Sequence, residues 1–299
     1  MAVTEVKPAI THTGAFSPSD WLLLTGIALT WGSSFVFIEV ALENFGPALI
    51  AFLRILFGAA TVVAVRKARQ PVERSDWGGV IVVGFLWMAI PFLLFPIAQQ
   101  WIDSSLAGMI NGAVPLFAVL VATLISRRLP GMSQAFGLII GFGGVVAVSW
   151  PAVQGARSTA TGVLLVLLAT VCYGIALNVV VPLQRKYGSL PILLRVQGVA
   201  LLLTLVPAAI AASDSTFAWT SLLAIVPLGC LGTGLAFVWM TVLAGRVGPS
   251  RGSVTIYFIP VVAIVLGTVF RDETIALVSL FGTALVLLGA YLTSRAERA

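Results

Sequence analysis

The residues best placed to do chemistry in this sequence are two prolines inside apolar stretches, Pro115 and Pro260. A proline within a helix has no amide hydrogen, and its ring clashes with the carbonyl group four residues earlier. Pro115 should therefore free the carbonyl of Asn111, and Pro260 should free that of Ile256. Free carbonyls inside a membrane protein can bind an ammonium group. A kink satisfied by a neighbouring hydroxyl or by water is the alternative interpretation.

Several polar and aromatic side chains within apolar stretches extend this set. The amide of Asn111 is costly to bury unless it faces a partner or a cavity. Trp31 and Trp87 can stack on a substrate or hold a cation against the ring, although a lipid-facing or core position is open for each. An aromatic residue followed by glycine recurs at Tyr173, and Tyr257 lies beside the second freed carbonyl. The candidate cavity residues are Trp31, Ser34, Arg54, Trp87, Asn111, Pro115, Tyr173, Ile256, Tyr257 and Pro260.

Charged residues inside the apolar stretches are few, and each requires a partner or a wet surface. Glu39 and Arg54 fall at similar depths below the same face, so a structural ion pair between them is the leading interpretation. Capture of a substrate carboxylate by Arg54 is the alternative. Arg195 lies near the opposite face and can extend its guanidinium to the membrane surface.

The residue types that catalytic sites and metal sites require are scarce in this sequence. The single histidine, His12, lies in the N-terminal tail, and the two cysteines, Cys172 and Cys230, lie in apolar stretches. We therefore expect no metal site, no cofactor and no catalytic residues. An intramembrane enzyme would need a cluster of nucleophile, base or metal ligands, so it is the weaker alternative to a transporter. An assembly subunit is a third.

Composition identifies the class of protein. The 299 residues are 59% hydrophobic and 9% charged, with a mean hydropathy of +1.07, whereas soluble proteins carry about 25% charged residues. Ser17 and Pro18 predict the start of the first helix. Windows of about 20 apolar residues predict an all-α membrane protein with ten spans: 21–42, 46–65, 77–99, 104–126, 132–150, 161–183, 190–212, 219–243, 251–270 and 275–294.

The basic residues divide between the two faces of this arrangement. Of the 17 Lys and Arg residues, 13 fall in the tails and loops of one face, two (Arg157 and Arg271) fall on the other face, and Arg54 and Arg195 lie within spans. Cytoplasmic loops are enriched in Lys and Arg, so both termini should be cytoplasmic. The high pI of about 9.9 then reflects topology, and a nucleic-acid partner is not expected.

The sequence also repeats itself weakly. A shift of 145 positions superposes Pro115 on Pro260, Phe92 on Phe237 and Gly144 on Gly289. With five spans per half, the second half must enter the membrane from the opposite side, and inverted repeats of this kind favour alternating access around a central site. The predicted organisation is a cytoplasmic tail (1–20), a first five-helix repeat (21–150) and a second repeat with a short tail (151–299).

These features resemble the EamA branch of the drug/metabolite transporter superfamily over about residues 21 to 294. The resemblance is carried by Trp31-Gly32-Ser33-Ser34, Phe52-Leu53-Arg54 and the mid-helix prolines Pro115 and Pro260. It is most similar to amino-acid exporters of the YddG type. Family members often have an acidic residue after the fourth and ninth spans, and here only the second half keeps it, at Asp272 and Glu273.

The resemblance implies a secondary transporter in the bacterial inner membrane. It would export small metabolites, most of all amino acids including aromatic ones, and organic cations or drugs are the alternative substrates. The outward direction is implied by the resemblance alone. The expected partners are a small-molecule substrate and the lipid bilayer. For the oligomeric state, a monomer and a homodimer are both compatible with the sequence.

Overall fold

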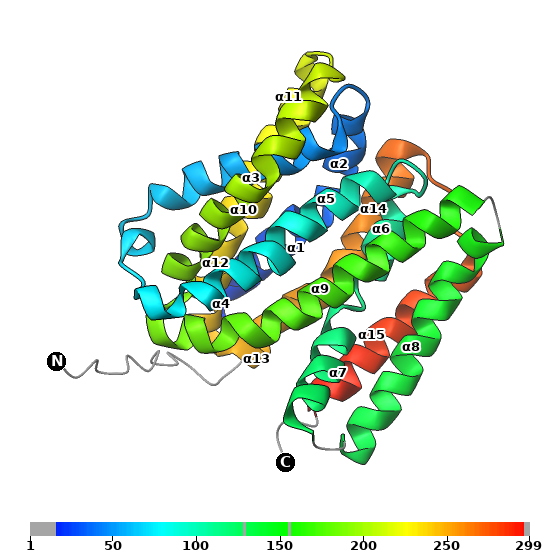
Figure 1. Ribbon diagram of the computed structural model, residues 1–299. Coiled ribbons are helices and arrows are strands. Elements are labelled where there is room, and N and C mark those ends of the chain that lie inside the picture. Colours follow the sequence, from blue (N-terminus) through cyan, green and yellow to red (C-terminus); the bar gives the residue numbers. More distant parts are fainter. Residues whose placement is uncertain (1–15, 128–129, 155–156, 296–299) are drawn as a thin grey trace.

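The computed structural model describes residues 16–127, 130–154 and 157–295, and every regular element in these ranges is helical. Figure 1 shows long helices packed side by side, joined by short connections. The elements of the first half are α1 (Pro18–Gly32), α2 (Ser34–Leu42), α3 (Pro47–Val63), η1 (Arg66–Arg69), η2 (Arg74–Asp76), α4 (Trp77–Val83), η3 (Gly84–Ala89), α5 (Ile90–Ala98), α6 (Ser104–Asn111), α7 (Val114–Ser126) and α8 (Met132–Val153).

The second half contains fewer but longer elements. They are α9 (Arg157–Tyr187), α10 (Ser189–Ser213), α11 (Trp219–Pro227), η4 (Leu228–Leu235), α12 (Ala236–Val247), α13 (Pro249–Gly252), η5 (Ser253–Phe258), α14 (Ile259–Arg271) and α15 (Leu277–Arg295). The start of α1 is as predicted. Ser17 and Asp20 form a reciprocal capping box, and Pro18 occupies the first turn.

Eight helical stretches in the described residues are long and apolar enough to cross a membrane. They are Pro18–Leu42, Arg74–Ala98, Ser104–Ser126, Met132–Ala152, Thr159–Tyr187, Ser189–Ser213, Trp219–Val247 and Ser253–Arg271. The predicted spans 46–65 and 275–294 correspond to shorter apolar helices, Pro47–Val63 and Leu277–Thr293. The all-helical membrane class is therefore confirmed, and the number of ten spans stays a prediction.

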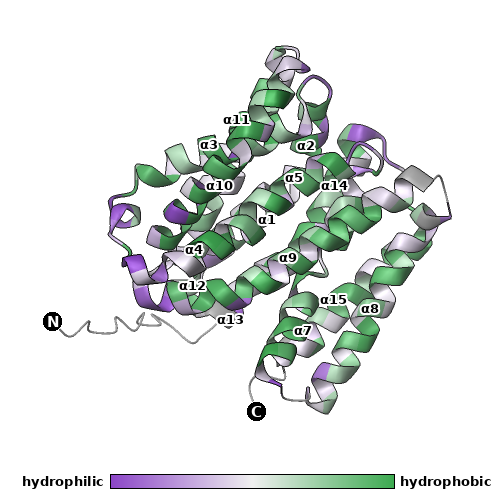
Figure 2. Ribbon diagram, viewed as in Figure 1, coloured by the Kyte–Doolittle hydropathy of each residue, from purple (hydrophilic) through white to green (hydrophobic). Residues whose placement is uncertain are grey.

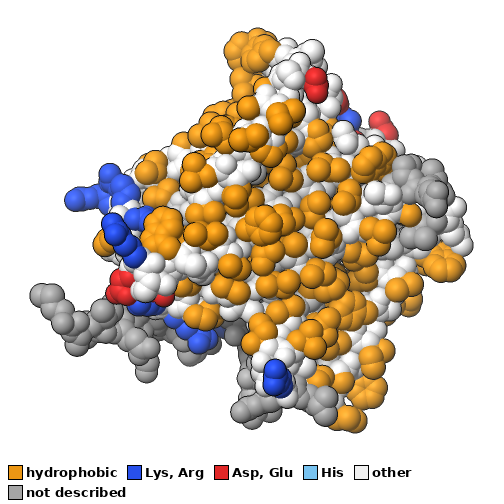
Figure 3. All heavy atoms as spheres, viewed as in Figure 1, with side chains coloured by type: hydrophobic (Ala, Val, Ile, Leu, Met, Phe, Trp, Pro, Cys, Tyr) orange, Lys and Arg blue, Asp and Glu red, His pale blue; other side chains and the backbone are white. Residues whose placement is uncertain are grey.

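The outer surface fits this class. Hydrophobic residues line the lengths of the helices and hydrophilic residues gather near their ends (Figure 2). The face seen in Figure 3 is covered by hydrophobic side chains, with Lys, Arg, Asp and Glu at its edges. Charged groups are costly in hydrocarbon, so this distribution suits a multi-pass membrane protein.

Several helices are interrupted at positions related by 145 residues. The π-helical segment η3 begins at Gly84 and its counterpart η4 spans Gly229. The residues that directly follow α7 and α14, Arg127 and Asp272, both have left-handed backbone (φ of 51° and 53°). Local backbone geometry thus follows the weak sequence repeat.

The two prolines interrupt their helices as predicted, but one expected consequence is wrong. Near Pro115 the helix breaks between α6 and α7, and before Pro260 it tightens into the 3₁₀ segment η5. The amide of Ile259 donates a hydrogen bond to the carbonyl of Ile256. That carbonyl is therefore not free, because the tighter winding supplies an i→i+3 donor. For the Asn111 carbonyl the structure describes no protein donor. That this carbonyl is free to bind a substrate stays a prediction.

The two interrupted helices pack closely against each other, through α6 and α14. A Cβ added to Gly108 would lie 2.3 Å from the Cβ of Ala263, and one added to Gly112 would lie 2.8 Å from Cγ of Pro260. Only glycine permits backbones to approach so closely. The crossing therefore fixes α6 against α14 and places both helix breaks beside the same interior space.

The helices α8 and α15 form a separate pair at one side of the molecule (Figure 1). Gly144 of α8 packs against the backbone carbonyl of Gly282 in α15, and Gly137 packs against that of Gly289. This pair contributes no residue to the cavity described next.

Candidate functional site

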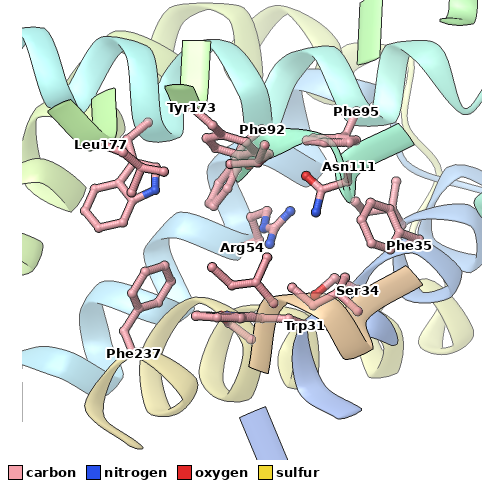
Figure 4. Close-up of a pocket in the computed structure, with 16 residues that line it drawn as sticks. Trp31, Ser34, Phe35, Arg54, Phe92, Phe95, Asn111, Tyr173, Leu177 and Phe237 are labelled. Carbon is pink, nitrogen blue, oxygen red and sulfur yellow. The ribbon is translucent and has the colours of Figure 1, made fainter. Parts of the chain in front are cut away.

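A cavity of about 170 Å³ lies where the interrupted helices cross. Its wall is contributed by both halves of the chain, from α1, α2, α3, η3, α5, α6 and α7 on one side and α9, η4, α12, η5 and α14 on the other. The lining residues are Trp31, Ser34, Phe35, Ile38, Arg54, Trp87, Phe92, Phe95, Asn111, Val114, Tyr173, Leu177, Gly232, Phe237, Ile256 and Ile259. Figure 4 shows their side chains.

Among the described residues that line this wall, Arg54 is the single one with a charged side chain. The residue is 6% exposed, its Nε lies 3.2 Å from the hydroxyl of Thr233, and its guanidinium carbon lies 3.7 Å from the ring centroid of Phe92. The Thr233 contact follows from close packing of α3 on η4, since a Cβ on Gly58 would lie 2.7 Å from Thr233. The backbone approach therefore aims the guanidinium into the cavity.

The predicted ion pair between Glu39 and Arg54 is wrong. Glu39 binds Arg271 instead, with 2.8 Å between Oε1 and Nε, and Arg271 also reaches Glu43 at 2.9 Å. The reason is that α2 packs against the end of α14, whereas Arg54 on α3 faces η4. Among the described residues, no carboxylate lies within ion-pair distance of Arg54.

One end of the cavity is walled by an aromatic triad, defined here as Trp31, Trp87 and Phe237. The ring of Phe237 meets Trp31 edge to face at 5.3 Å and Trp87 at 5.5 Å. The Nε1 of Trp31 donates to the carbonyl of Gly232 at 3.0 Å, which fixes the plane of the indole. The indole N–H is thereby satisfied, so the triad offers apolar ring surface.

The other end combines aromatic rings with polar tips. Phe95 stacks on Tyr173 at 6.1 Å and meets Phe35 at 5.6 Å. Figure 4 shows Arg54 and Asn111 pointing toward each other in the middle of the cavity. In the described part of the chain, neither the Asn111 amide nor the Tyr173 hydroxyl has a protein hydrogen-bond partner. Both remain available to a ligand.

The structure places seven of the ten candidate residues on the cavity wall: Trp31, Ser34, Arg54, Trp87, Asn111, Tyr173 and Ile256. Tyr257 is a correction, because its hydroxyl donates to the carbonyl of Ala290 in α15. Neighbours in a 3₁₀ turn point about 120° apart, so Ile256 faces the cavity and Tyr257 faces away. Pro115 and Pro260 adjoin lining residues but do not themselves line the cavity.

The candidate residues chosen from the sequence include none of the four lining phenylalanines, Phe35, Phe92, Phe95 and Phe237, and not Thr233. The one available signal is that Phe92 aligns with Phe237 in the internal repeat, and both line the cavity. Isolated phenylalanines in an apolar sequence give no indication of which ones face an interior space.

The sequence matches the EamA-like transporter family model twice, over residues 20–150 and 160–295. A probable terminal-alkyne amino-acid exporter of Streptantibioticus cattleyicolor is 26% identical, over 93% of this chain and 94% of that protein. An uncharacterized transporter of Archaeoglobus fulgidus is 26% identical over 92% and 98%, and a probable amino-acid metabolite efflux pump of Escherichia coli is 23% identical over 92% and 95%.

Among solved structures, one protein crystal structure superposes with a TM-score of 0.63 and 19% identity, covering 95% of this chain and all of the other. That likeness concerns the fold alone. The family matches cover most of the sequence, and the related proteins are named as transporters rather than enzymes. The chain therefore belongs to the EamA-like transporter family.

Proposed function

We propose that this membrane protein exports small carboxylate-bearing metabolites, in the first place aromatic and other apolar amino acids. The observation that carries the proposal is the state of Arg54. A guanidinium has five N–H donors, and only Nε has a hydrogen-bond partner in the described residues. A buried cation whose remaining donors face a cavity, with no protein carboxylate beside it, suits a substrate carboxylate that binds through two parallel hydrogen bonds.

The aromatic triad supplies the complementary part of the site. Apolar rings at one end and a cation in the middle of the cavity suit a molecule with a carboxylate head and an apolar or aromatic side chain. The same cation opposes the alternative of organic-cation export, because two positive charges would share a low-dielectric space. Relatives named as probable amino-acid exporters support this substrate class.

For the mechanism we propose alternating access between two inverted five-helix repeats, with ten spans and both termini in the cytoplasm. The two family matches, the paired π-helical segments and the paired left-handed residues Arg127 and Asp272 support the repeat. The wall of the cavity is shared by both halves, so a movement of one half against the other would expose it to alternate sides.

Counterflow in liposomes tests the proposed substrate class. Vesicles loaded with unlabelled phenylalanine should accumulate labelled phenylalanine, and excess leucine should suppress the signal. Arg54→Gln should reduce uptake more than about tenfold. The matched control is Arg195→Gln, the other arginine within a predicted span, whose guanidinium binds the backbone carbonyls of Ala68 and Arg69 far from the cavity. Transport of organic cations with inert amino acids would overturn the proposal.

Cysteine labelling tests the topology. In a variant lacking Cys172 and Cys230, Gln154→Cys should react with an impermeant maleimide added outside intact cells. Gln70→Cys, which is also exposed, should react only after the membrane is opened. The reverse pattern would overturn the assignment of the termini.

A further inference from the structure

The cavity has a cation and hydrogen-bond donors, but the described residues that line it include no carboxylate to balance an ammonium ion. In the part of the chain that the structure describes, one arginine lines the cavity and no aspartate or glutamate does. The nearest described acid on the lining helices α1 and α2, Glu39, is held by Arg271 outside the cavity wall. A zwitterionic substrate would therefore find its negative end recognised and its positive end without a counterion.

Backbone carbonyls do not replace the missing acid. The carbonyl of Ile256 accepts the amide of Ile259, and that of Gly232 accepts the indole N–H of Trp31. The Ser34 hydroxyl donates to the carbonyl of Thr30 at 2.9 Å. A carbonyl or hydroxyl oxygen with one protein partner can still accept a second hydrogen bond, and the structure describes no donor for the carbonyl of Asn111. These acceptors are neutral, however, so none of them supplies the negative charge that would balance an ammonium ion.

The face of an aromatic ring can also receive an ammonium ion, but several ring faces in this cavity already contact other protein groups. Arg54 lies over the face of Phe92, and Phe95 and Tyr173 are stacked on each other. A substrate ammonium beside its own carboxylate would also lie close to the guanidinium that holds that carboxylate. Like charges repel strongly in a poorly solvated site.

Resting on the proposed function, we infer that the site recognises aryl and apolar monocarboxylates as its general substrate class, and that the α-ammonium group of an amino acid is dispensable. Three polar groups form the carboxylate subsite: the guanidinium of Arg54, the amide of Asn111 and the hydroxyl of Tyr173. The aromatic triad receives the apolar end. Amino acids are then one member of a wider set that includes their deaminated counterparts.

Three ligands that share a phenylethyl skeleton separate the two charges. L-Phenylalanine carries both, 3-phenylpropionate carries only the carboxylate, and 2-phenylethylamine carries only the ammonium. Equilibrium binding to the purified full-length protein in detergent, followed by tryptophan fluorescence and calorimetry, avoids passive leakage of the neutral acid across a bilayer. The dissociation constant of 3-phenylpropionate should equal that of phenylalanine within about threefold or be lower, and 2-phenylethylamine should bind more than about tenfold more weakly.

Single substitutions test which side chains form the carboxylate subsite. Tyr173→Phe and Asn111→Leu should weaken both carboxylates in parallel, because neither group is assigned to the ammonium. Arg54→Gln should abolish carboxylate binding, and Tyr173→Phe, which keeps the ring stacked on Phe95, remains informative if the Arg54 variant does not fold. Arg195→Gln should leave both dissociation constants unchanged.

The outcomes are distinguishable. If phenylalanine binds and 3-phenylpropionate does not, an ammonium receptor exists, so this inference is overturned while the proposed function stands. If neither carboxylate binds, the proposed function fails as well. If 2-phenylethylamine binds as tightly as the carboxylates, the assignment of Arg54 as a carboxylate ligand is wrong.

Discussion

The guanidinium of Arg271 holds the carboxylate of Glu39 at 2.8 Å, and thereby fastens the last residue of α14 to α2. The second oxygen of Glu39 is buried and has no hydrogen-bond partner among the described residues. A partly buried carboxylate in this position depends on its arginine, since loss of one partner leaves the other charge poorly solvated. The contact joins the first half of the chain to the second.

This ion pair should be detectable by a double-mutant cycle. Glu39→Gln and Arg271→Gln should each lower the thermal midpoint in detergent. The loss of unfolding free energy in the double variant should be smaller than the sum of the two single losses by about 1 kcal/mol, because both side chains are about one-quarter exposed. Glu43→Gln should couple less, as Glu43 is 47% exposed. Glu39→Gln and Arg54→Gln should be additive, and coupling between them would restore the pair that the structure contradicts.

Glu273, which follows α14, makes a second link between the halves because its side chain binds the start of α6. Its carboxylate accepts hydrogen bonds from the amides of Ser104 and Ser105 at 3.0 Å and from the Ser104 hydroxyl at 2.5 Å. Amides at a helix N-terminus favour a negative partner. Glu273→Gln should therefore destabilise the protein by about 2 kcal/mol, since an amide nitrogen would face amide donors.

The matched control for this prediction is the neighbouring residue. Asp272→Asn also removes one negative charge, and asparagine tolerates the left-handed conformation that Asp272 adopts. Its thermal midpoint should stay close to that of the parent. Equal losses in both variants would show that net charge, rather than the cap on α6, is responsible.

Asp103 should make the stability of the same region depend on pH. Partial loss of water around its carboxyl, and then the negative charge of Glu273, raise its pKa above the ordinary value. The folded protein thus binds this proton more tightly than the unfolded chain. The stabilising contribution is fully present below the unfolded-state pKa and is lost as pH rises through the folded-state pKa.

Asp103→Asn tests this pH dependence directly. The variant cannot ionise at this position, so its thermal midpoint should exceed that of the parent at pH 7. The difference should shrink as pH falls toward about 4, where the carboxyl becomes protonated. A difference that is independent of pH would mean that Asp103 acts through packing rather than through charge.

The sequence predicts the features that depend on local composition. Hydropathy places the helical stretches, and Pro115 and Pro260 mark the two helix breaks. Polarity within apolar stretches selects Asn111, Arg54 and Trp31, which the structure brings to one cavity. Each of these predictions rests on the free-energy cost of placing a proline or a polar residue within its own apolar segment. It therefore requires no knowledge of how the helices pack.

Features that depend on the rotation and pairing of helices could not be predicted. Whether Ile256 or Tyr257 faces the cavity depends on the 3₁₀ winding of η5, which the sequence does not specify. The partner of Glu39 depends on which helix end packs beside α2. The count of basic residues predicts a loop position for Arg271, and only the packing of α14 against α2 shows that it is the counterion of Glu39.

The scaffold pair α8 and α15 offers a prediction with an internal control. A Cβ added to Gly144 would lie 2.6 Å from both the carbonyl oxygen of Gly282 and the amide nitrogen of Val286, whereas one added to the adjacent Gly143 meets nothing within 4 Å. Overpacking against backbone cannot be relieved by a change of rotamer, so Gly144→Ala should cost about 1–3 kcal/mol. Gly143→Ala should leave the thermal midpoint unchanged or raise it slightly, because alanine loses less backbone entropy than glycine. Neither residue lines the cavity, so the dissociation constant for phenylalanine should be the same in both variants. A selective loss of phenylalanine affinity in Gly144→Ala would show that the α8–α15 pair takes part in binding rather than supporting the other helices from outside.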